Sequence, residues 1–262
     1  MTENLTECRL GLSDAVWQET VLRVCRNHPI TELLQEDPYT RRAIEKPRGY
    51  SGDAVTKICS PFGKQIFQAV TASTNGASVR WRRWHIAELI NGLAQHHASL
   101  DVLSVACGHC REGLLLNRET RARIRIAIDQ DPESLAVVDR TFGDAITSCR
   151  MSANKLVTTQ DLEGFDFIYS AGLFDYLDDA SAIVLTQALL DKAKPGGMLL
   201  LANFTKDNWG RGYMEAFMNW QLVLRTRNDM SKLVPTRQVA GSYLYFDPYL
   251  NVGYLQIMKS DY

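Results

Sequence analysis

From residue 100 onward, short apolar runs alternate with segments of helix length. The apolar runs are 100–106, 124–128, 165–170 and 197–204, and the helix-length segments include 131–141 and 179–193. Runs this apolar leave no polar face for water, so they predict a parallel sheet covered by helices on both sides. The stretch 242–259 differs, because two runs with turn formers around Asp247 and Pro248 predict an antiparallel hairpin.

The first third of the chain has a different texture. Residues 1–97 show no alternating apolar pattern, and four prolines divide them, at Pro29, Pro38, Pro47 and Pro61, which is typical of helices with breaks. A chain of 262 residues with 45% hydrophobic content buries one large α/β core plus an added helical segment. We therefore predict a helical cap or lid over residues 1–97 and a ligand-binding α/β domain over residues 98–262.

Charge and cysteine usage limit the partners. With 29 basic and 30 acidic residues, the chain lacks the net charge that attracts nucleic acid or an anionic membrane, and a small-molecule ligand is expected instead. The start of the chain has no basic segment followed by an apolar run, which predicts a cytoplasmic protein. Six scattered cysteines predict free thiols. No feature of the sequence indicates an oligomeric state.

A candidate nucleotide-binding loop follows the first apolar run. Small residues around Gly108 let the backbone approach a ligand, and a helix start offers unpaired N–H groups. Asp129 comes 21 residues after Gly108, at the end of the second run, where an acid can bind ribose hydroxyls. A dinucleotide fingerprint requires a third small residue at position 111, where Arg111 stands, so a nicotinamide cofactor is disfavoured. An ordinary strand–helix turn stays an alternative.

The same loop contains two cysteines, Cys107 and Cys110, at the spacing of a thioredoxin-like redox pair. The tryptophan that usually precedes such a pair is replaced by Ala106. A zinc site would need a second pair of ligands at sensible spacing, which the chain lacks. We therefore expect neither redox chemistry nor a metal here.

Six stretches together resemble one enzyme family. They are KPRGYSGD (46–53), SVACGHCRE (104–112), IAIDQDPESL (126–135), FDFIYSAGLFDYL (165–177), KPGGMLLLANF (194–204) and YMEAFMNWQLVLR (213–225). From about residue 39 to 259 the chain resembles the S-adenosylmethionine (SAM)-dependent family for 3-hydroxypalmitic acid methyl ester biosynthesis, of which a related branch is similar to the azetidine-2-carboxylate synthases. This implies an α/β, Rossmann-like class I methyltransferase fold with a seven-stranded, mostly parallel sheet, and SAM without a metal. Ser104 and Cys110 depart from the usual acid and glycine.

The resemblance also implies which residues face SAM. They are Ala106, Gly108 and Arg111 at its amino-acid end, Asp129 at the ribose, Ser152 and Ala153 at the adenine, and Ser170 and Ala171 under the sulfonium. Gln130, next to Asp129, is a further candidate for SAM binding, as are Tyr50, which could close over SAM from the cap, and Arg48, which could pair with a carboxylate. For Ser152 and Ala153 a plain loop is the alternative. For Arg48 the alternative is a solvated surface arginine.

Displacement at a sulfonium requires an oriented nucleophile and the exclusion of water. Aromatic faces hold such a cation by about 0.5–2 kcal/mol each, and Tyr176 and Trp220 are the leading candidates, although Trp220 can equally pack a helix. Asn203 and Asp175 are candidates to hydrogen-bond an attacking amine or carboxylate, and Asp175 can instead cap a following helix. The basic-aromatic run 80–85 is interpreted as a solvated helix face with its tryptophans turned inward.

Two reactions fit these residues. In the first, the α-amine of SAM attacks its own γ-carbon and gives azetidine-2-carboxylate and 5′-methylthioadenosine. In the second, SAM methylates a small-molecule or fatty-acid carboxylate, which needs no general base. The first is slightly favoured, because the chain is short and has only a modest cap. A catalytically silent SAM-binding protein is the third alternative.

Overall fold

The computed structural model of the 262-residue chain describes residues 72–97, 99–117, 122–217 and 220–261. These residues divide into two compact units. The larger unit holds Trp81–Lys206 and Val223–Tyr262 and contains every strand of the sheet. Of the smaller unit, the structure describes residues 72–80 and most of Asp207–Leu222. The second of these segments contains α12 (Arg211–Phe217). Most of the predicted cap lies outside the described residues, so the cap and its boundary stay predictions.

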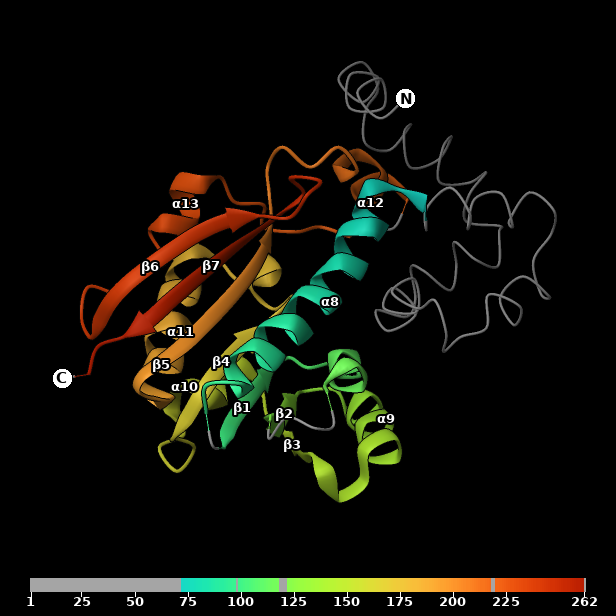
Figure 1. Ribbon diagram of the computed structural model, residues 1–262. Coiled ribbons are helices and arrows are strands. Elements are labelled where there is room, and N and C mark those ends of the chain that lie inside the picture. Colours follow the sequence, from blue (N-terminus) through green and yellow to red (C-terminus); the bar gives the residue numbers. More distant parts are fainter. Residues whose placement is uncertain (1–71, 98, 118–121, 218–219, 262) are drawn as a thin grey trace, which may run out of the picture. The chain divides into compact units, whose positions relative to one another are not determined.

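The larger unit is built on a seven-stranded sheet with the order β3-β2-β1-β4-β5-β7-β6 (Figure 1). Its strands are β1 (Leu100–Val105), β2 (Ala122–Asp129), β3 (Thr147–Arg150), β4 (Phe165–Ser170), β5 (Ala193–Phe204), β6 (Val239–Phe246) and β7 (Val252–Lys259). Strands β1 to β5 pair in parallel, and β7 pairs antiparallel with both β5 and β6. The predicted mostly parallel sheet with an antiparallel C-terminal hairpin is confirmed.

Helices cover both faces of the sheet (Figure 1), and the apolar central strands β1 and β4 contain no exposed residue. On one face lie α10 (Ala153–Thr158), α11 (Asp179–Lys192) and α13 (Arg227–Ser231), which bury Leu156, Leu189 and Met230 in the core (Figure 1). The other face is covered by α9 (Pro132–Phe142) and, from Trp81 on, by α8 (Thr74–Ala94). This burial is the main source of the fold's stability.

Local signals set where the helices begin. The Asp131 carboxylate accepts hydrogen bonds from the backbone N–H groups of Glu133 and Ser134, and α9 follows with a proline at its first position. At the start of α11, the Asp178 carboxylate accepts a hydrogen bond from Ser181 N at 2.8 Å. The helices predicted over 131–141 and 179–193 are therefore confirmed, and Asp178, not Asp175, is the cap.

Three short 3-10 helices stand in the described loops of the larger unit. The loop after β1 leads into η2 (Arg111–Leu115), and the other two are η3 (Gly143–Ala145) and η4 (Phe174–Tyr176).

The sequence predicts that the tryptophans of α8 turn inward. Trp81 does contact Tyr254 on β7, but Trp84 is 52% exposed, so the expectation is wrong for Trp84.

A buried arginine ties the loop after β4 to the end of β5. Arg225 is 1% exposed, and its backbone N–H donates to Phe204 O. Its guanidinium donates to the carbonyl oxygens of Phe174 and Leu177, both at 2.7 Å, and to Asn203 Oδ1 at 2.6 Å. It also pairs with the Asp179 carboxylate at 3.0 Å. One side chain therefore holds the segment 174–179 in place.

Replacing Arg225 by methionine should lower the free energy of unfolding by about 3–5 kcal/mol, because acceptors buried around a missing guanidinium lose their donor. The matched control is Arg237→Met, since Arg237 is exposed, and it should stay within about 0.5 kcal/mol of the parent. Urea unfolding followed by far-UV circular dichroism measures both. Equal effects of the two substitutions would contradict the structural role of Arg225.

Candidate functional site

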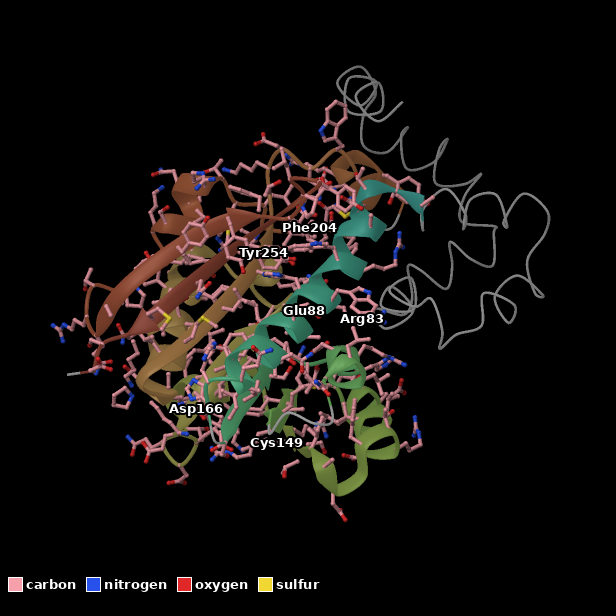
Figure 2. The ribbon with its side chains drawn as sticks, in the orientation of Figure 1. Arg83, Glu88, Cys149, Asp166, Phe204 and Tyr254 are labelled. Atoms are coloured by element: carbon pink, nitrogen blue, oxygen red, sulfur yellow. The ribbon has the colours of Figure 1, made fainter. Side chains whose placement is uncertain are left out.

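The carboxyl ends of the parallel strands lie along one edge of the sheet, and ligands of open α/β sheets bind at this edge. Figure 2 shows Phe204, the last residue of β5, near Tyr254 at this edge, and Asp166 near the start of β4 toward the opposite edge. Phe204 pairs with Val252, and Tyr254 pairs with Ala202. The predicted SAM-facing residues that the structure describes follow the ends of β1, β2, β3 and β4.

The loop after β1 turns sharply through three residues with positive φ. These are Ala106 (53°), Gly108 (53°) and Cys110 (51°). Glycine adopts this left-handed conformation freely, whereas an L side chain there costs about 1–2 kcal/mol. The loop thus keeps a glycine-type backbone at two positions that carry side chains. Such strain is frequent at ligand-binding loops.

Asp129, at the end of β2, reaches this loop. Its side chain is 4% exposed, and Oδ2 accepts a hydrogen bond from Gly108 N at 2.8 Å. Oδ1 accepts one from Asp131 N at 3.0 Å. The structure therefore brings Gly108 and Asp129 together. Because a carboxylate has about four acceptor positions, this acid can accept from a ribose as well as from the backbone.

Beneath the loop, Tyr169 on β4 donates a hydrogen bond to Glu112 Oε1 at 2.5 Å. Cys110 Sγ lies 4.0 Å from the same phenol, and burial raises the pKa of the Cys110 thiol well above its usual value. A protonated, buried thiol is a poor nucleophile, which argues against the thioredoxin-like alternative. Cys107, Cys110 and Cys149, the cysteines in the described part of the chain, are free thiols, as predicted.

The end of β4 meets a cation from α8. An Arg82 Nη1–H donates to Ala171 O. The guanidinium also lies against Gly172, since a Cβ built there would be 3.8 Å from Nη1. Next to them, Ser170 is 1% exposed and its hydroxyl has no hydrogen-bond partner in the part of the chain that the structure describes. The predicted sulfonium position therefore has an arginine beside it, which the sequence did not indicate.

Asp175 is the buried acid of this edge. It is 2% exposed, and its Oδ1 accepts a hydrogen bond from Phe204 N at 2.7 Å. Burial raises the pKa of Asp175 to about 7, although the Phe204 N–H and the charges of Arg82 and Arg225 act in the opposite direction. The group therefore gains and loses a proton near neutral pH, as a general base requires.

Tyr176 and Asn203, two more catalytic candidates, differ in exposure. Tyr176 follows Asp175 in η4 and is 54% exposed, so its ring is accessible to a ligand. Asn203 is 1% exposed, and its Nδ2 donates to Phe204 O and Val223 O while its Oδ1 accepts from Arg225. These bonds favour a positioning role for Asn203 over contact with a ligand.

The remaining predicted residues have less direct places. Ser152 is the N-cap of α10, with Oγ accepting from Lys155 N at 3.3 Å, and Ala153 is the first helical residue. Gln130 is exposed and its carbonyl accepts from Arg150, while Arg111 Nη2 lies 3.5 Å from His109 Nδ1. Trp220 belongs to the smaller unit. Arg48 and Tyr50 lie outside the described residues.

Sequence reasoning missed Arg82, Arg225 and Tyr254. Arg82 stands in the run 80–85, whose pattern indicates a solvated helix face, and Arg225 ends the stretch 213–225, which carries only the family resemblance. Tyr254 has the pattern of an ordinary strand residue of the hairpin. Arg82 and Arg225 bond to residues far along the chain, and the burial of Tyr254 depends on the packed sheet, so local pattern contained no signal for the three.

No protein-family model matches the chain, and no curated protein matches it. Solved structures do. A possible exported protein from Bordetella parapertussis has a TM-score of 0.63 at 20% identity, over 88% of this chain and 86% of that one. Magnesium protoporphyrin IX methyltransferase from Synechocystis PCC 6803 with bound S-adenosylhomocysteine (SAH) has a TM-score of 0.59 at 11% identity, over 88% of this chain and 98% of that one. The same enzyme with bound SAM has a TM-score of 0.57 at 12% identity, over 88% of this chain and 95% of that one. The chain has the fold of class I SAM-dependent methyltransferases.

In the part of the chain that the structure describes, no group of three or more His, Cys, Asp or Glu side chains is arranged to hold a metal ion. No helix in the same part of the chain is both long enough and apolar enough to cross a bilayer.

The pKa of Asp175 predicts how stability changes with pH. Because the folded state holds a proton up to about pH 7 that the unfolded chain releases near pH 4, stability from this group is greatest at low pH. The free energy of unfolding should fall by roughly 1 kcal/mol per pH unit between about pH 5 and pH 7. Urea unfolding of the parent and of Asp175→Asn checks this, since the difference between them isolates Asp175. Parallel pH profiles would contradict it.

Proposed function

We propose that the chain is a cytoplasmic SAM-consuming enzyme that acts on a small molecule at the carboxyl edge of β1, β2 and β4. The observation that carries the proposal is the contact between Asp129 and the strained loop at Gly108, which puts an acid suited to a ribose beside an approachable backbone. The unpartnered Ser170 hydroxyl at the end of β4, within the described residues, fits it, because buried polar atoms normally have a partner.

Asp129 would hold the ribose, and the backbone of Ala106–Gly108 would face the amino-acid end of SAM. Tyr176, 54% exposed, would offer its ring to the sulfonium. Ser170 and Ala171 lie at the end of the strand from which the Tyr176 loop leaves. When SAM is bound, its sulfonium supplies a carbon ready for displacement and a neutral thioether as leaving group. The protein's task is to orient the nucleophile and exclude water.

Asp175 favours cyclisation of SAM over methyl transfer to a carboxylate. In the cyclisation, the α-amine lone pair forms a bond to the γ-carbon, and the C–S bond breaks with its electron pair passing to the sulfur of 5′-methylthioadenosine. The amine gives up a proton in this reaction, whereas a carboxylate acceptor has none to give. Asp175, with its pKa of about 7, is the group at this edge suited to accept that proton.

Methyl transfer to a small-molecule or fatty-acid carboxylate is the second candidate. Its support comes from the Synechocystis structures, because the enzyme that they contain is named a methyltransferase. Both reactions use the same pocket for SAM, so they share every binding residue proposed above and differ in the nucleophile.

Incubation of the purified full-length chain with SAM alone tests the proposal. We expect mass spectrometry to show 5′-methylthioadenosine together with azetidine-2-carboxylate. Asp129→Ala should weaken SAM binding at least about ten-fold, since hydrogen bonds to a charged group contribute about 1.5–3 kcal/mol; the control is Asp144→Ala, at an exposed position. SAH formed only with an added carboxylic acid would support methyl transfer, and no binding of SAM or SAH would overturn both reactions.

Removal of the Tyr176 ring should slow the reaction more than it weakens binding. A cation–π contact of about 0.5–2 kcal/mol that strengthens in the transition state corresponds to a rate loss of roughly 2–30-fold in Tyr176→Ala. Initial rates and equilibrium dialysis of SAM separate the two effects. Tyr249→Ala, at a 43% exposed tyrosine in the turn between β6 and β7, is the control. A full rate in Tyr176→Ala would remove Tyr176 from the site.

A further inference from the structure

Tyr254 on β7 buries a hydroxyl group without a partner. The residue is 0% exposed, and its OH has no hydrogen bond in the described part of the chain. The ring itself is well packed: it stands edge-on to Trp81 and His85, with centroids 5.5 and 5.2 Å away, and stacks on Tyr245 at 5.4 Å. A phenylalanine at this position would make the same ring contacts, so they do not account for the hydroxyl group.

An unpartnered buried hydroxyl destabilises a fold, and native structures contain few of them. Phenylalanine would preserve the same ring contacts without that loss. The hydroxyl therefore indicates a ligand atom as its partner. It is a donor, because burial raises the pKa of Tyr254 well above its usual value and keeps the phenol protonated.

The cation whose charge acts most strongly on this phenol is Arg82, from α8. Arg82 also lies at the end of β4, where it donates to Ala171 O and packs against Gly172. The neighbouring histidine adds no charge, because burial lowers the pKa of His85 to about 4 and its Nε2 is 2.6 Å from Tyr245 OH. A guanidinium provides only donors and the protonated phenol provides one, and a carboxylate is the group that accepts from both.

We propose that Arg82 and Tyr254 bind the carboxylate of the substrate where β4 ends and β7 begins. This rests on the proposed function and specifies its substrate as a carboxylic acid. Two acids lie near the same phenol, Asp175 and Asp247. Asp247 accepts a hydrogen bond from Val252 N at 2.9 Å, and Asp175, with a pKa of about 7, is ionised only in part near neutral pH, so their repulsion of an incoming carboxylate is reduced. Because Tyr254 is fully covered and Arg82 is half-buried, a carboxylate between them has reduced access to water, which strengthens the ion pair.

The carboxylate has two sources, the amino-acid end of SAM itself or a separate carboxylic acid that accepts the methyl group. Cyclisation uses the first, since the molecule reacts with itself. Methyl transfer to an acid uses the second. The chemistry of recognition is the same for both, and ligands that differ by one carboxylate distinguish them.

Tyr254→Phe is the decisive variant, because it keeps the ring and removes only the hydroxyl. Its melting temperature should equal or exceed that of the parent, since the folded protein loses no hydrogen bond. We expect it to bind SAH at least ten-fold more weakly and to bind decarboxylated SAH, which keeps the amine, with unchanged affinity. Tyr243→Phe is the control: Tyr243 is 66% exposed on β6 and should change neither affinity. Arg82→Gln should repeat the selective loss for SAH.

If Tyr254→Phe binds SAH and decarboxylated SAH with the same affinities as the parent, the same variant is assayed with SAM and a long-chain 3-hydroxy fatty acid. A ten-fold rise in the fatty-acid concentration that gives half the maximal rate then places the acceptor's carboxylate at Arg82 and Tyr254. Parent-like values for SAH, for its decarboxylated form and for the fatty acid would overturn the inference while leaving SAM binding intact. A parent protein that binds neither SAH nor its decarboxylated form would instead overturn the proposed function.

Discussion

The hydrogen bonds of Arg225 hold the carboxyl edge of the sheet in one arrangement. Beyond Ser170 the chain leaves β4 and has no strand partner among the described residues, so the path of the following loop depends on contacts outside the sheet. Arg225 supplies most of them by bonding the loop carbonyls of Phe174 and Leu177 and, through Asn203, the end of β5, while Val223 N donates to Asp175 O. Asp175 and Tyr176 sit within that loop. Folding of this edge and placement of its acid and its exposed ring are therefore one event.

Burial sets the chemistry of that acid. Asp175 has two arginines and a backbone N–H nearby, each of which lowers its pKa, yet the loss of water raises the pKa to about 7. Asp229 shows the opposite balance on the surface, where hydrogen bonds from Thr226 and two lysines hold its pKa well below the usual range. The same residue type thus titrates near neutral pH in one place and stays ionised in the capping box of α13 in the other, because the two carboxyl groups differ in access to water.

Sequence pattern predicted what depends on neighbours along the chain. Apolar runs marked the strands, helix-length segments between them marked α9 and α11, and the adjacency of β1 and β2 brings Asp129 to Gly108. Arg82 was misread because its partner, Ala171, lies 89 positions away. Periodicity assigns a residue to a face of a helix, but it does not say what packs against that face. The same limit applies to a prediction for Tyr254, since only the packed sheet reveals that its hydroxyl has no partner among the described residues.

The charges at this edge suit a ligand that carries both signs. Asp129, Asp175 and Asp247 are acidic, Arg82 is basic, and Arg225 is paired with Asp179. A bare sulfonium near Arg82 would be repelled, whereas a molecule with its own carboxylate can pair that group with Arg82 and keep its cation toward Tyr176 and the acids. Such an arrangement fixes the direction of the amino-acid chain as well as its affinity. For cyclisation that direction matters most, because the nucleophile and the carbon under attack belong to the same short chain.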